Sequence, residues 1–192
     1  MKNRIWIGLI CVLLLAGGCV PSLHQLYTNR TVTMDDHLPG IWQNSDEEEV
    51  WTFREKDRGY RLSIVQQEND DKVKISELDV TLVSLYGKTY MDWYPADQDI
   101  DAGDYYKMTM LPVHLFVKVH DTDPNLVLSL MDLEKVTDLL KKSPDLVKHE
   151  NREDYVILTA QPEELQQFIM KPEVDAEIWG DTITLNRISG GK

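Results

Sequence analysis

The fold is decided by the stretch from Trp51 to Ile64, which reads WTFREKDRGYRLSI. Large apolar side chains alternate with polar ones on both sides of the turn-forming residues 56–59. Alternation with a period of two places one apolar face inward and one polar face toward water, as in an antiparallel sheet with a single buried side. The stretch therefore predicts a β-hairpin with an apolar inner face.

The same pattern continues through most of the chain. Further strands are expected at 41–42, 73–86, 89–94, 113–119, 126–130, 155–159 and 182–188, with turns between them. Within 73–86 the apolar phase shifts by one residue between Ile75 and Leu78, which predicts a β-bulge. About nine short strands in succession favour a mostly β fold, an antiparallel up-and-down barrel of eight to nine strands, over a sandwich.

Two helices are expected late in the chain. Asp132 is suited to cap a helix that carries Leu133 and Val136 on one side and ends near Ser143, because Pro144 follows. The second helix is expected to begin at Pro162, with acidic residues in its first turn and Leu165, Phe168 and Ile169 on its inner face.

The beginning of the chain has the pattern of a secretory signal. Lys2 and Arg4 precede an apolar run from Ile5 to Leu15, and the small residues Ala16 to Gly18 follow. The run is shorter than the roughly 20 apolar residues of a transmembrane helix. The segment from Leu15 to Cys19 resembles the lipobox of bacterial lipoproteins. That resemblance implies that residues 1–18 are removed and that Cys19 carries acyl chains of the palmitate type.

Cleavage at this position sets the chemistry of the mature chain. It removes Lys2, Arg4 and no acidic residue, so the formal charge changes from −13 to −15. Such a surface repels nucleic acid and anionic headgroups, so membrane attachment is expected through the lipid alone. Cys11 leaves with the signal, and no thiol besides Cys19 remains. The predicted organisation is a signal peptide at 1–18, a lipidated tether at 19–37 and a barrel domain at 38–192.

A second resemblance concerns the folded domain. Gly40-Ile41-Trp42, at the start of the first strand, resembles the G-x-W signature of lipocalins, and the chain is similar to lipocalin-like bacterial lipoproteins of unassigned function. The resemblance also includes the segments 22–28, 38–53, 87–95, 111–114 and 163–168. It implies that Trp42 closes one end of an eight-stranded barrel. A clear T-D-Y motif and the disulfides of the family are absent.

Six inward-facing side chains are the candidate lining of a ligand pocket of about 300 Å³ inside the barrel. They are Trp51, Phe53, Tyr60, Leu62, Met91 and Trp93. Tyr60 favours a void, because a buried phenol requires a hydrogen-bond partner that a dry core lacks. The alternative is that these side chains fill the core, as in many small barrels.

Metal binding and catalysis are not expected. The aspartates at 97, 99, 101 and 104 imitate part of a calcium loop, but Ala102 stands where the EF-hand pattern needs glycine. His114 and His120 lie on one strand without a third ligand nearby in sequence. Hydrolase, phosphate-loop and dinucleotide motifs are absent. We therefore expect no enzyme, no cofactor and no metal.

Two functions follow from these observations. The first is a membrane-anchored lipoprotein that binds a small apolar ligand or lipid at the cell envelope. The alternative is a non-enzymatic interaction or accessory subunit of an envelope complex, with a filled barrel. In a Gram-negative cell the expected site is the outer membrane facing the periplasm, because the inner-membrane retention signal of many such bacteria is an aspartate directly after the cysteine, where this chain has Val20.

Overall fold

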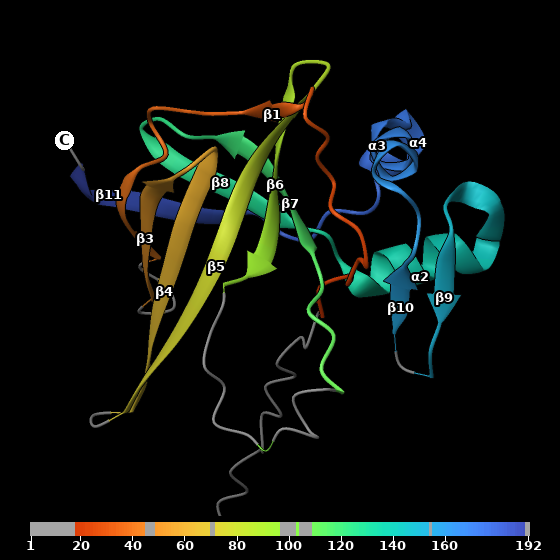
Figure 1. The fold of residues 1–192 in the computed structure, drawn as a ribbon, viewed down its shortest axis with the longest axis horizontal. Coiled ribbons are helices and arrows are strands. Elements are labelled where there is room, and N and C mark those ends of the chain that lie inside the picture. Colours follow the sequence, from red (N-terminus) through yellow and green to blue (C-terminus); the bar gives the residue numbers. More distant parts are fainter. Residues whose placement is uncertain are drawn as a thin grey trace, which may run out of the picture.

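The protein is an eight-stranded antiparallel barrel with a small helical layer on its outer wall (Figure 1). The computed structural model describes residues 18–44, 49–69, 72–96, 103, 109–153 and 155–190. The barrel strands are β2 (Gly40–Asn44), β3 (Glu49–Lys56), β4 (Gly59–Asn69), β5 (Lys72–Leu85), β6 (Lys88–Pro95), β7 (Leu115–Asp121), β8 (Asn125–Leu130) and β11 (Ile183–Gly190). Each strand pairs with the next, and pairing of β5 with β6 closes the ring. The predicted up-and-down barrel is confirmed.

The predicted hairpin that decides the fold is present, with its apolar side chains on the inner face. Trp51 pairs with Ile64 and Phe53 with Leu62 across β3 and β4, and these inward side chains alternate with more exposed neighbours. The β5–β6 turn is also at its predicted place. Tyr86 and Gly87 both have positive φ angles, 49° and 84°. This is the pattern of the two-residue turns that match the twist of a hairpin.

The bulge predicted within β5 is wrong. The pairing of β5 with β4 is regular from Val80 to Val73, and its pairing with β6 is regular throughout. The apolar phase shifts because Val73 and Ile75 lie on the outer face of the sheet, where they are 58% and 60% exposed. They do not face the core, so no extra residue is needed to bring them there.

The helical layer is inserted between β8 and β11. It holds α2 (Leu133–Lys142), a 3₁₀ turn η1 (Pro144–Leu146), the hairpin β9 (His149–Asn151) and β10 (Val156–Leu158), α3 (Pro162–Met170) and α4 (Pro172–Asp175). The two predicted helices are confirmed as α2 and α3, and Asp132 caps α2 by accepting from the Lys135 amide at 2.9 Å. The turn η1, strand β9 and helix α4 were not predicted.

The protein has two apolar cores. One fills the barrel and contains the inward side chains of its strands. The other lies between the helical layer and the outer wall, where Tyr90 of β6 and Phe116 of β7 meet Val136, Leu165 and Phe168. The helices therefore cover one side of the barrel and leave its ends to other segments.

The segment 19–37, predicted to be a tether, is packed along the outer wall of the barrel. Val20, Ser22 and Leu26 are each 0% exposed. The Ser22 amide donates to the His114 carbonyl at 2.9 Å, and the Ser22 carbonyl accepts from the His114 amide at 2.8 Å. Farther on, β1 (Val32–Thr33) pairs with Val83 and Leu82 of β5 as a ninth strand. The backbone is irregular as expected, but it belongs to the packed body.

Candidate functional site: the barrel interior and its two ends

The six candidate pocket residues lie together inside the barrel and are almost completely buried. Their exposed fractions range from 0 to 4%. Trp51 and Trp93 meet edge to face, with ring centroids 5.5 Å apart. Such burial is found both for side chains that fill an interior and for side chains around a small closed void, whereas the close contact of the two indole rings is typical of a packed core. The packing favours a filled interior at these positions, and the pocket stays a prediction that a binding assay can decide.

The phenol of Tyr60 has partners, which removes the argument that it requires a void. Its hydroxyl donates to the carbonyl of Asp35 at 3.0 Å and accepts from the amide of the same residue at 2.7 Å. Burial raises the pKa of this phenol above its usual value, so it stays protonated at neutral pH. Tyr60 thus links the barrel wall to the segment that leads into β2.

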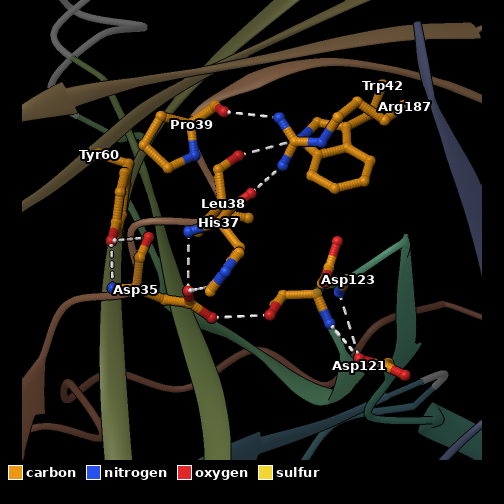
Figure 2. Close-up of polar contacts among 10 residues, drawn as sticks. Asp35, His37, Leu38, Pro39, Trp42, Tyr60, Asp121, Asp123 and Arg187 are labelled. Atoms are coloured by element: carbon orange, nitrogen blue, oxygen red, sulfur yellow. Dashed lines mark hydrogen bonds and ion pairs between the residues drawn. The ribbon is translucent and has the colours of Figure 1, made fainter. Parts of the chain in front are cut away.

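The end of the barrel where β2 begins is closed around Trp42, and we call it the Trp42 end (Figure 2). Gly40 has a φ of 146°, which favours glycine. The Trp42 indole is 0% exposed and donates to the carbonyl of Leu38 at 3.0 Å. The guanidinium of Arg187, from β11, lies 4.1 Å from the Trp42 ring centroid and donates to the carbonyls of Pro39 and His37.

Asp35 adds a second layer to the Trp42 end. It accepts from the His37 amide at 2.9 Å and from the Thr122 hydroxyl at 2.8 Å, which joins this segment to the β7–β8 turn (Figure 2). Burial alone would raise the pKa of Asp35, but these hydrogen bonds and the His37 ring lower it. Asp35 and Arg187 were not singled out from the sequence. The one signal that could have identified Arg187 is its position two residues after the inward-facing Leu185 in the last strand, where a cation is unusual.

The opposite end of the barrel holds a buried carboxylate. Glu49 is 8% exposed. It accepts from the Trp51 indole at 2.9 Å and from the amide of Gln66. Around this level the inward apolar side chains are only partly buried: Ile64, Leu78, Leu115, Leu130 and Ile183. This end therefore combines a circle of partly buried apolar side chains with the hydrogen-bonded pair of Glu49 and Gln66.

The outer wall holds a second buried carboxylate, under the N-terminal segment. Asp92 is 1% exposed and accepts from the Leu26 amide at 2.6 Å. It also pairs with Nδ1 of His114 at 2.6 Å, and the His114 ring stacks on Tyr94 at 4.5 Å. This arrangement fastens residues 22–26 to β6 and β7. A buried Asp–His pair also occurs in catalytic triads, but the Ser22 hydroxyl bonds to the His24 carbonyl and not to the imidazole.

Asp175 fastens the helical layer to the same wall. Its carboxylate accepts from Lys88 and Lys118 at 2.8 Å and from the Trp179 indole at 2.9 Å. Burial would raise the pKa of Asp175, but these three donors lower it to about 2. Burial and this carboxylate raise the pKa of the Tyr90 phenol. The network joins α4 to β6 and β7.

In the described part of the chain, neither His114, just before β7, nor His120, within β7, belongs to a metal cluster. His114 is bound to Asp92, and His120 contacts the Ser129 hydroxyl at 3.0 Å. Among the residues that the structure describes, no group of three or more histidine, cysteine or acidic side chains is arranged to hold a metal ion. The four aspartates of the candidate calcium loop lie outside the described residues.

A surface hollow of about 270 Å³ lies outside the barrel, near the Trp42 end. It is lined by residues of the N-terminal segment, the β3–β4 turn and β5, including Tyr27, Asn29, Arg58 and Thr81. Of its two cationic lining residues, Lys56 is paired with Asp79 at 2.9 Å. The hollow lies on the outer surface and shares only Tyr60 with the six candidate pocket residues, so it does not correspond to the predicted pocket inside the barrel.

Cys19 lies against the body of the protein, at the end of the barrel opposite Trp42. It forms a β-bridge with Asp132, two residues beyond the end of β8. Burial raises the pKa of its thiol, and the Asp132 carboxylate adds to this effect. Residues 1–17 of the predicted signal peptide lie outside the described part of the chain.

No helix in the described residues has the length and apolar character needed to cross a membrane. Comparisons of the chain with protein-family models, with curated proteins and with solved structures find no match.

Proposed function

We propose that this chain is a non-enzymatic lipoprotein, lipocalin-like in its barrel and anchored in the cell envelope through Cys19, that acts through its surface as an interaction or accessory protein. The observation that carries this choice over ligand transport is the burial of the inward side chains together with the hydrogen-bond partners of their polar atoms. All six candidate pocket residues are at most 4% exposed. The Tyr60 hydroxyl and the Trp51 and Trp93 indoles have partners inside the fold.

The lipocalin-like part of the proposal is supported by the place of the G-x-W signature. Gly40 and Trp42 stand at the first barrel strand, and the Trp42 ring closes that end under Arg187. The anchored part is supported by the sequence before Cys19 and by the position of this residue on the surface of the body. In a Gram-negative host, Val20 after the cysteine favours the outer membrane.

A binding assay with an engineered void tests the filled interior. The native protein and a Phe53→Ala variant are titrated with a fluorescent fatty-acid analogue and with benzene. We expect no saturable binding by the native protein. The variant should bind benzene, because an apolar cavity left by a large side chain takes up such a molecule. Tyr86→Ala, at a 94% exposed ring, is the control that removes an aromatic side chain without opening the core.

The second candidate function is binding of a small apolar molecule at the end opposite Trp42. The partly buried ring of Ile64, Leu115 and Ile183 near the Glu49 carboxylate favours it. Saturable binding of the fatty-acid analogue by the native protein, weakened by Leu115→Asp, would favour this function over the first.

A further inference from the structure

We infer that the end of the barrel opposite Trp42, which we call the Cys19 end, faces a lipid bilayer and contacts it through exposed apolar side chains. This inference rests on the proposed lipid anchor at Cys19 and goes beyond it. It assigns an orientation and a contact surface to the anchored protein.

The first step is the position of the anchor. Val20 follows Cys19 and bonds to the carbonyl of Met131, just beyond β8. Ser22 pairs with His114, which directly precedes β7. Strand β8 ends and strand β7 begins at the end of the barrel opposite Trp42, as their pairing with the neighbouring strands requires. The anchor therefore attaches at this end.

The second step is that no flexible linker separates Cys19 from the folded domain in the described structure. Val20 and Ser22 are 0% exposed. The Leu23 amide donates to the carbonyl of Leu158, and the Leu158 amide donates to the carbonyl of Pro21, both at 2.9 Å. A flexible linker of a dozen residues would allow a separation of about 20 Å and free rotation. Here the chain is fixed from the residue after the anchor, so the bilayer lies close to the Cys19 end.

The third step is what this end exposes. Val73 and Ile75 are 58% and 60% exposed beside the β4–β5 turn, and Leu111 is 68% exposed ahead of β7. Met110 is 45% exposed beside Leu111. Tyr155 is 44% exposed just before β10, which runs parallel to the segment at Ser22 and so begins toward the Cys19 end. These segments project to the same side in Figure 1, away from β1 and the β5–β6 turn.

The chemistry of these side chains fits a bilayer. Three separate segments present exposed apolar groups at the end of the barrel to which Cys19 belongs. Apolar side chains of surface-bound proteins enter about 5–10 Å into the boundary between headgroups and acyl chains. The net charge of the mature chain is strongly negative, so attraction to anionic headgroups cannot provide this contact. Burial of apolar surface supplies it instead.

Single-cysteine labelling tests the orientation, because lipidation leaves the mature chain without another thiol. Leu111→Cys and Tyr155→Cys are labelled with an environment-sensitive fluorophore in the full lipidated protein. The control is Tyr86→Cys, at the β5–β6 turn of the Trp42 end. The proteins are placed in vesicles of phosphatidylethanolamine and phosphatidylglycerol that contain nitroxide lipid. We expect quenching at 111 and 155 to exceed that at 86 by about twofold or more, since only the first two lie at the depth of the headgroups.

Equal quenching at the three positions, or stronger quenching at 86, would overturn the orientation while leaving the anchor intact. A native protein whose Cys19 reacts with the dye and which stays out of the vesicles would instead overturn the anchor itself. Insertion of twelve Gly and Ser residues after Cys19 tests the short attachment. Quenching at 111 should then fall to the level at 86, and unchanged quenching would show that the attachment does not orient the domain.

Discussion

Replacing Asp175 with asparagine should weaken the junction between the helical layer and the barrel by about 2 kcal/mol at neutral pH. The carboxylate of Asp175 accepts from two lysines and an indole, and its pKa is lowered to about 2 from an ordinary 3.8. At about 1.4 kcal/mol for each pKa unit, this difference corresponds to about 2 kcal/mol of folding free energy. The side chain is 12% exposed, so screening by solvent is limited.

The sign of the pH dependence follows from the lowered pKa. The unfolded chain binds the proton more tightly than the folded one, so the stabilisation is complete above about pH 4 and is lost as the pH falls through 2. Urea unfolding of the protein in detergent, followed by tryptophan fluorescence, measures the free energy of unfolding at each pH. The difference in the free energy of unfolding between the native protein and Asp175→Asn should become smaller below pH 4 and disappear near pH 2.

The matched control is Asp138→Asn. Asp138 is paired with Lys141 at 3.3 Å, but its side chain is 56% exposed, so we expect a loss below about 0.5 kcal/mol. Equal losses in the two variants, or a gap for Asp175→Asn that persists at pH 2, would refute the reasoning from the buried network.

Three further predictions concern other parts of the molecule. Trp42→Ala should cost about 3–5 kcal/mol in urea unfolding, because it removes a buried large aromatic ring; a loss below about 1 kcal/mol, the range of surface changes, would contradict its role in closing the barrel. Asp92→Ala should cost about 1–3 kcal/mol and speed hydrogen exchange of the Leu26 amide, because the buried carboxylate that accepts from this amide is removed; unchanged exchange would show that Asp92 does not fasten the N-terminal segment. Cys19→Ser should leave the protein uncleaved or soluble, and a processed variant that still fractionates with membranes would contradict the lipoprotein proposal.

The barrel could be predicted from the sequence because its signals are local. Alternation in the segment 51–64 and turn residues such as Gly87 define strands and hairpins without knowledge of distant partners. The starts of α2 and α3 can likewise be recognised from residues that are close to them in the sequence. The predicted bulge failed because alternation was taken to mean a buried face, whereas Val73 and Ile75 face outward. Two exposed apolar residues and a bulge that changes the buried face produce the same order of apolar and polar residues in the sequence.

The functional site was less predictable because its contacts join residues far apart in the chain. Tyr60 was correctly expected to need a hydrogen-bond partner, but that partner is the backbone of Asp35, 25 residues away. Arg187 meets Trp42 across the pairing of the last barrel strand with the first. The packing of the predicted tether depends on Asp92 and His114 from the middle of the chain. None of these pairings has a local sequence signal.

Native mass spectrometry of the protein extracted from the membranes of its host tests most directly the claim of a lipid-anchored chain with a filled barrel. We predict a polypeptide that begins at Cys19, carries covalently bound acyl chains and releases no small apolar molecule when it is gently activated in the gas phase. A chain that retains residues 1–18 with an unmodified cysteine would contradict the anchor. A stoichiometric apolar molecule released from the protein would contradict the filled barrel.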